Sequence, residues 1–124
     1  MFSTPTHVKF RSENDLNHRK LLSQKILSKF PNCVPLIIGV AKNSRFPELS
    51  RYKYLVPKEL TISKLLLRVR MEISMDPHSA LFLMVNNRIC IPSSVIGELY
   101  QQFKDQDGFL FVTICKESIF GSHL

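Results

Sequence analysis

Cysteine and histidine are the side chains in this sequence that could act as nucleophiles or bind a metal. The three cysteines, Cys33, Cys90 and Cys115, lie far apart and form no C-x-x-C pair. An odd number without that spacing indicates neither a disulfide framework nor a zinc site, so we expect reduced thiols. The four histidines show no H-x-x-x-H or H-E-x-x-H spacing: His7, His18, His78 and His123. We therefore predict a protein that is not an enzyme, with no catalytic residue, metal or cofactor.

The last residues offer a different kind of chemistry, that of a backbone carboxylate. An apolar run over residues 109–115 is followed by a short polar step, then by Phe120 and Gly121, and three more residues complete the sequence. A tail of that length cannot fold alone. Glycine has no Cβ, so the active site of another protein can close around its carbonyl. Taken alone, however, such a terminus is more often disordered and without a role.

Composition and charge limit the class of protein. With 124 residues and a mean hydropathy of 0.00, the chain has the size and composition of one globular domain. Its apolar runs reach about seven residues, whereas a membrane-spanning helix needs roughly 20. The first residues show no secretory signal pattern, so we expect a cytoplasmic protein.

The net charge of +7 is unevenly distributed along the sequence. Residues 1–70 contain 14 Lys and Arg against 4 Asp and Glu, whereas residues 71–124 contain 3 against 6. The first part should therefore attract acidic groups, which could belong to phosphates, anionic lipid headgroups or acidic peptides.

Residues 12–31 are predicted to form an amphipathic helix. Apolar side chains recur at i, i+4 and i+8, which places them on one helical face: Leu22, Ile26 and Phe30. Ser12 with Asp15 resembles a capping box at the start, and Pro31 is expected to stop the helix. A shorter helical piece is expected before it, near residues 4–10.

Two further helices are expected later in the chain. Thr61 is placed to cap a helix over residues 62–73, and Pro77 to close it. Its apolar stripe consists of Ile62, Leu65, Leu66, Val69 and Ile73. Ser93 or Ser94 is expected to cap a helix through "VIGELYQQFK".

Five segments predict strands, at residues 35–41, 51–57, 80–85, 88–91 and 109–115. The first two should form a hairpin. Asn86-Asn87 suits a tight turn because Asn tolerates positive φ, and Asp107-Gly108 should turn the chain into the last strand. After the N-terminal helices the predicted order is ββαββαβ. Because the last strand is apolar on both faces, it should lie in the middle of the sheet. This pattern indicates an α+β fold, a ubiquitin-like β-grasp with an N-terminal helical extension.

Four segments carry a resemblance to a known family: "KFPNCVPLII", "YKYLVPKELT", "ALFLMVNNRI" and "GELYQQFKDQDGFLFVTICKESIFG". In order and spacing they resemble the autophagy ubiquitin-like modifiers, the family of autophagy-related protein 8, microtubule-associated protein light chain 3 and GABA-receptor-associated protein. The resemblance covers nearly the whole chain. It implies one domain, with a helical extension over 1–31, a β-grasp core over 32–121 and a removable tail over 122–124.

The resemblance also implies a function for the C-terminal glycine. A cysteine protease would cut after Gly121, and an E1-like enzyme would activate the new carboxylate as a thioester. An E2-like enzyme would then join it to phosphatidylethanolamine, so that a cytoplasmic protein becomes bound to the autophagosomal membrane. On this reading Phe120 and Gly121 are the conjugation and cleavage residues.

Two apolar grooves are implied in the same way, as sites for cargo receptors with an aromatic-x-x-aliphatic motif. The first groove comprises Ile26, Pro35, Lys53, Leu55 and Phe109. The second comprises Tyr54, Val56, Pro57, Leu60, Leu65, Arg68 and Val69. Strand alternation places Lys53 and Leu55 opposite to Tyr54 and Val56. If the second strand is a sheet edge, a peptide can add to it as a further strand, with Arg51 and Lys53 near its acidic flank.

Three positions depart from the usual family pattern, and each bears on partner preference. Leu22 stands where an acidic residue is common, Cys33 where a basic residue often lies, and Arg68 where the second groove normally has an apolar wall.

Two alternatives to a conjugated modifier remain open from the residues. The first is a nucleic-acid-binding module, suggested by an isoelectric point near 9.6 and by Arg19, Lys20, Lys25 and Lys29 on one helix. No aromatic stacking motif or helix-turn-helix signature accompanies this charge, so a solvated basic face is favoured and no nucleic acid is expected. The second is a ubiquitin-like adaptor that is never conjugated.

Overall fold

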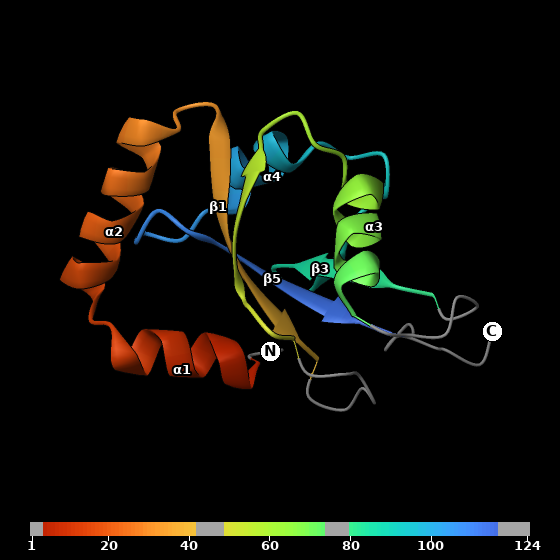
Figure 1. Cartoon of the computed structure of the whole chain (residues 1–124), viewed down its shortest axis with the longest axis horizontal. Coiled ribbons are helices and arrows are strands. Elements are labelled where there is room, and N and C mark those ends of the chain that lie inside the picture. Colours follow the sequence, from red (N-terminus) through yellow and green to blue (C-terminus); the bar gives the residue numbers. More distant parts are fainter. Residues whose placement is uncertain (1–3, 42–48, 74–79, 117–124) are drawn as a thin grey trace.

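The fold is built on one mixed five-stranded sheet, which the computed structural model describes over residues 4–41, 49–73 and 80–116 (Figure 1). The strands are β1 (Cys33–Val40), β2 (Lys53–Pro57), β3 (Phe82–Val85), β4 (Arg88–Ile89) and β5 (Leu110–Cys115). The helices are α1 (Pro5–Glu13), α2 (Leu16–Lys29), α3 (Ile62–Glu72) and α4 (Ile96–Phe103). The predicted order ββαββαβ after the N-terminal helices is confirmed.

The strand order β2-β1-β5-β3-β4 places β5 in the centre of the sheet, as its apolar sequence predicted. β5 runs parallel to β1 and antiparallel to β3, and the predicted hairpin of β1 and β2 is present. β2 and β4 are the two edges. Each strand starts or ends one to two residues from its predicted limits, and β4 is only two residues long because it ends at Ile89 rather than at residue 91.

The two faces of the sheet are covered by different layers. In Figure 1, α1 and α2 lie on one side of the sheet, called the outer face below, and α3 lies on the other, the inner face. The inner face carries the main apolar core, to which every strand but β4 contributes, with Ile62, Leu65 and Val69 of α3 and Ile96 and Tyr100 of α4. The outer face carries a smaller cluster of Phe10, Ile37 and Phe109, packed against Leu22 and Ile26 of α2.

Two helix starts differ from their predictions. Asp15, not Ser12, is the N-cap of α2, because its side chain accepts the His18 N–H at 2.8 Å while Ser12 lies within α1, which is longer than expected. α4 begins after Val95 without a side-chain cap, so neither Ser93 nor Ser94 serves. The predicted cap at Thr61 is confirmed, since its hydroxyl accepts the Lys64 N–H.

The α4 start needs no side-chain cap because another loop supplies backbone acceptors. The N–H of Ile96 donates to the carbonyl of Leu60 at 2.8 Å, and the N–H of Gly97 donates to that of Lys58 at 2.8 Å. A Cβ on Gly97 would lie 2.8 Å from the same Lys58 oxygen, so glycine permits this close approach.

The turn predictions are confirmed by backbone angles. Asn86 and Asn87 have φ values of 53° and 64°, and Gly108 has a φ of 90°. Pro77, expected to close α3, lies outside the described residues, and α3 ends before it at Glu72. Phe30, assigned to the apolar face of α2, is 48% exposed, whereas Arg19 and Ser23 are buried there. Among the described residues, no helix combines the length and apolar character that crossing a bilayer requires.

Candidate functional site

β2 is an edge strand whose two faces have opposite character. Within the described part of the sheet it pairs with β1 alone, so its other side is open to a further strand. Lys53, Leu55 and Pro57 are exposed, whereas Tyr54 and Val56 are buried, which confirms the predicted alternation. An incoming peptide strand would therefore meet a cationic and apolar outer face on one side and the main core on the other.

The residues predicted for the first groove share the outer face. Pro35 lies opposite Leu55 in the ladder of β1 and β2. Phe109 is buried and packs in the same cluster as the half-buried Ile26. The Lys53 ammonium lies 5.7 Å from the centre of the Phe10 ring and 5.8 Å from that of Tyr52, so the cation is held near aromatic faces. Leu55, 39% exposed, is the accessible apolar side chain of this set.

The residues predicted for the second groove are brought together between β2 and α3, mostly as core. Tyr54, Val56, Leu65 and Val69 are at most 7% exposed and belong to one cluster, against which Leu60 packs. Pro57 and Arg68 are exposed. The four buried residues thus form the floor of this region, and the exposed residues lie at its rim.

Glu72 bridges the open edge and the helix beside it, and the sequence prediction missed it. Its Oε1 lies 2.5 Å from Nη2 of Arg51, and its Oε2 accepts a short hydrogen bond from the Tyr54 hydroxyl. The Arg51 guanidinium also lies 4.5 Å from the centre of the Tyr54 ring. The hydrogen bond from Tyr54 and the charge of Arg51 lower the pKa of the Glu72 carboxyl, while burial and this bond raise the pKa of Tyr54.

A buried ion pair fixes α2 to the turn before β5. Nε of Arg19 donates to Oδ2 of Asp107 at 2.8 Å, and the other carboxylate oxygen accepts the Phe109 N–H at 2.8 Å. The Ser23 hydroxyl donates to the Asp107 carbonyl at 2.5 Å. Burial raises the pKa of Asp107, and the Phe109 N–H and Arg19 oppose that rise. Arg19 is therefore not part of a solvated basic face.

α1 is seated on the outer face by buried polar groups. The Thr4 side chain occupies the space where a Cβ on Gly39 would stand, so α1 starts directly on β1. His7 is 5% exposed, its Nε2 is 2.9 Å from the Val112 carbonyl, and its ring makes a T-shaped contact with the ring of Phe111. Burial lowers the pKa of His7, so the neutral imidazole is favoured in the folded protein.

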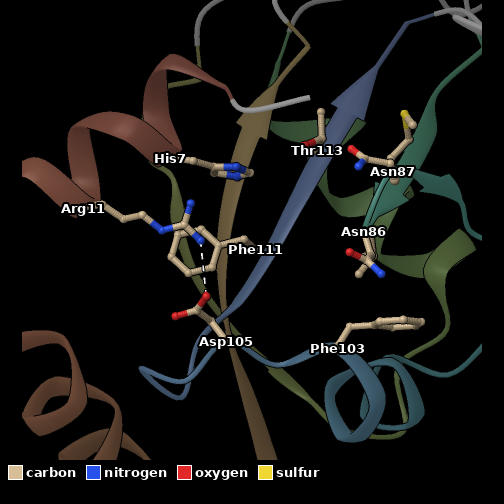
Figure 2. Close-up of a pocket in the computed structure, with 10 residues that line it drawn as sticks. His7, Arg11, Asn86, Asn87, Phe103, Asp105, Phe111 and Thr113 are labelled. Carbon is tan, nitrogen blue, oxygen red and sulfur yellow. Dashed lines mark hydrogen bonds and ion pairs between the residues drawn. The ribbon is translucent and has the colours of Figure 1, made fainter. Parts of the chain in front are cut away.

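A polar cavity of about 200 Å³ lies on the outer face between α1 and the turn of β3 and β4 (Figure 2). In Figure 2, His7 and Arg11 line one side, Asn86 and Asn87 the other, and Phe111 of β5 lies between them. The Arg11 guanidinium lies 4.0 Å from the centre of the Phe111 ring and 3.4 Å from Asp105. No residue of the predicted grooves lines this cavity.

A second, more apolar cavity of about 440 Å³ lies where the end of α2 approaches the start of α4. Leu27, Cys33 and Tyr100 are among its lining residues. The three cysteines are free, and burial raises the pKa of Cys90 and Cys115, which reduces their reactivity. Phe120 and Gly121, predicted for cleavage and conjugation, lie outside the described residues, as does the tail over 122–124.

Comparison with known proteins identifies a family model and relatives that match most of this chain. The family model "Autophagy protein Atg8 ubiquitin like" matches residues 18–121. Autophagy-related protein 8 of Vanderwaltozyma polyspora is 39% identical over 91% of this chain and 96% of that protein, and the Dictyostelium discoideum protein is 34% identical over 93% and 95%.

Solved structures agree in fold. Trypanosoma brucei ATG8 has a TM-score of 0.84 at 30% identity, covering 91% of this chain and 97% of its own. Plasmodium falciparum Atg8, solved in complex with a Plasmodium falciparum Atg3 peptide, has a TM-score of 0.77 at 25% identity, covering 88% and 96%. The β-grasp with its open β2 edge and the match over residues 18–121 agree: this chain belongs to the Atg8 family of autophagy ubiquitin-like proteins.

Proposed function

We propose that this chain is a conjugated ubiquitin-like modifier of autophagy. A cysteine protease hydrolyses the peptide bond after Gly121 and releases residues 122–124. An E1-like enzyme activates the Gly121 carboxylate as an acyl phosphate ester by consuming a nucleoside triphosphate, and an enzyme thiol then displaces the nucleotide to form a thioester. An E2-like enzyme transfers the acyl group to the amine of phosphatidylethanolamine, which forms an amide and frees the enzyme thiol. The cytoplasmic protein thereby becomes attached to the autophagosomal membrane.

On the membrane the chain recruits partners through its β2 edge, and the open edge of this strand is the observation that carries the proposal. A peptide of the form aromatic-x-x-aliphatic adds beside β2, with its first anchor near Leu55 and Phe109 and its fourth near Leu60 and Arg68. Two buried anchors contribute roughly 1.5–3 kcal/mol each, and the strand hydrogen bonds about 1 each. After ordering costs, the affinity should be on the order of micromolar.

Two further observations support the peptide site. Lys53 is exposed on the outer face of the strand, and Arg51 lies two residues before β2, so both cations are near the position of the acidic residues that precede such motifs. The relative from Plasmodium falciparum has been solved with a peptide bound, and a peptide of the conjugating machinery is therefore a reasonable ligand for this chain as well.

The conjugation step is tested by intact mass of the protein recovered from soluble and membrane fractions of its own cells. The native chain should lose residues 122–124 and, in the membrane fraction, gain the mass of a phospholipid. Gly121→Ala should block both changes, whereas Ser122→Ala, the matched control next to the cleaved bond, should allow both. A lipid-linked Gly121→Ala chain, or a native chain that keeps its tail in every fraction, would contradict the proposal.

A further inference from the structure

Glu72 joins β2 and α3 through contacts that leave both partners accessible. The side chain of Arg51 is 59% exposed and that of Glu72 34% exposed, and their charged atoms are 2.5 Å apart. The second carboxylate oxygen is held by the hydroxyl of Tyr54, whose ring is buried in the main core. The carboxylate is thus held by a buried residue of the strand, while the Arg51 guanidinium, which also lies over the Tyr54 ring, is exposed enough to contact a second acidic partner.

Glu72 stands at a position in α3 where the helix dipole disfavours a negative charge. Glu72 is the last residue of α3, where the helix dipole places partial negative charge. A glutamate there is opposed by the dipole and needs compensation from outside the helix. Arg51 and Tyr54, which lie outside the helix, both contact this carboxylate and supply such compensation.

The bridge also lies at the site proposed above for partner peptides, on which this inference rests. Arg51 precedes the open edge of β2, and Tyr54 and the helix α3 belong to the second groove. An acidic residue that flanks an incoming peptide would need the Arg51 guanidinium, which already has a carboxylate partner. Lys53, in contrast, lies near aromatic rings, and none of the ion pairs among the described residues involves it.

We propose that Glu72 is a specificity-determining residue that competes with the acidic flank of the partner peptide for Arg51. In the free protein Glu72 partly neutralises Arg51, so an acidic residue of the bound peptide must share the guanidinium with Glu72 or displace it. The chain therefore discriminates weakly between acidic and neutral flanks at Arg51, and its choice of partner depends more on the two apolar anchors and on Lys53.

The competition is measured by calorimetry with two synthetic peptides that share one aromatic-x-x-aliphatic core. One has three aspartates before the core and the other has three asparagines, which keep the shape and remove the charge. The ratio of the two affinities should rise about two- to fivefold in Glu72→Gln, the scale of an exposed ion pair. Tyr54→Phe, which frees the other side of the carboxylate, should raise the ratio in the same direction but by less.

Glu59→Gln is the matched control, because it removes an exposed carboxylate from the turn after the opposite end of β2. It should leave the ratio unchanged. An unchanged ratio in Glu72→Gln, with or without a loss of stability, would show that the bridge does not affect peptide choice. It would overturn this inference and leave the proposed peptide site standing. Failure of both peptides to bind native and Glu72→Gln protein would overturn the proposed peptide site, and the inference with it.

Discussion

Replacing Asp107 with Ala should destabilise this protein far more than the same change at Asp105, two residues earlier. The side chain of Asp107 is 0% exposed, and that of its partner Arg19 is 10% exposed. Removing one member of a buried ion pair leaves the other charge uncompensated, at a cost of about 3–5 kcal/mol. The pair of Asp105 with Arg11 is longer, at 3.4 Å, and 27% and 41% exposed, so its loss should cost about 0–1 kcal/mol.

The Asp105 side chain also accepts the Asp107 N–H at 3.1 Å. Loss of this hydrogen bond should add about 1 kcal/mol to the destabilisation caused by Asp105→Ala. Urea unfolding separates the two variants clearly. With a slope of about 1.5 kcal/mol per molar, a loss of 4 kcal/mol lowers the urea midpoint by roughly 2.5 M, whereas Asp105→Ala should lower it by about 1 M. Both variants should be measured at one pH, with the native chain as reference.

A double-mutant cycle isolates the ion pair itself. Arg19→Met removes the cation and keeps the packed stem, and combining it with Asp107→Ala removes both charges. The double variant should be more stable than the sum of the single losses predicts, by about 2–3 kcal/mol. Equal urea midpoints for Asp107→Ala and Asp105→Ala, or strictly additive losses in the cycle, would refute the assignment of α2 attachment to this pair.

Three further predictions follow from the described contacts. Because burial lowers the pKa of His7, its contribution to stability should be complete above pH 6.5 and decline on acidification through the folded-state pKa, by up to about 1.4 kcal/mol per pH unit. His7→Gln should flatten this slope in urea midpoints at pH 7.5 and 5.5, and an unchanged slope would contradict it. Lys53→Glu should weaken an acidic-flanked peptide in calorimetry, more at low salt than at high, so a salt-independent loss would argue against direct charge pairing. Arg68→Leu should widen the second groove, shift preference on a peptide array from Val or Ile toward Leu, and remove about 0.5–1 kcal/mol of benefit from a neighbouring acid. The same ranking of aliphatic anchors on the native and Arg68→Leu proteins would show that Arg68 does not contribute to the second groove.

The sheet could be predicted from the sequence because its signals are local. The apolar run of β5 indicated a central strand, and Asn86-Asn87 and Gly108 indicated turns that their positive φ values confirm. Helix starts were less reliable, since several polar residues can cap. Asp15 caps α2 three residues after the predicted Ser12, and α4 relies on carbonyls from a loop more than 30 residues earlier, for which its own sequence has no signal.

The polar contacts of the site could not be predicted, because their partners are distant in sequence. Arg19 and Asp107 are 88 residues apart, and Arg51 and Glu72 are 21 residues apart. In the sequence, Arg19 is one of several cations on a helix, and Glu72 is a single acid at a helix end. Only the folded sheet brings each charge to its partner, whereas the apolar faces of β2 follow directly from strand alternation.

The layers on the two faces of the sheet bury surfaces of different polarity, and this difference should be visible in calorimetry. Buried polar residues gather between α1, α2 and the outer face, namely Thr4, His7, Arg19, Ser23, Asp107 and Thr113, whereas the inner core is almost entirely apolar. Exposure of apolar surface raises the heat capacity, and exposure of polar surface lowers it. Detachment of α1 and α2 therefore carries a smaller heat-capacity change than unfolding of the sheet. The stability of the layer formed by α1 and α2 should accordingly vary with temperature along a flatter curve than that of the inner core.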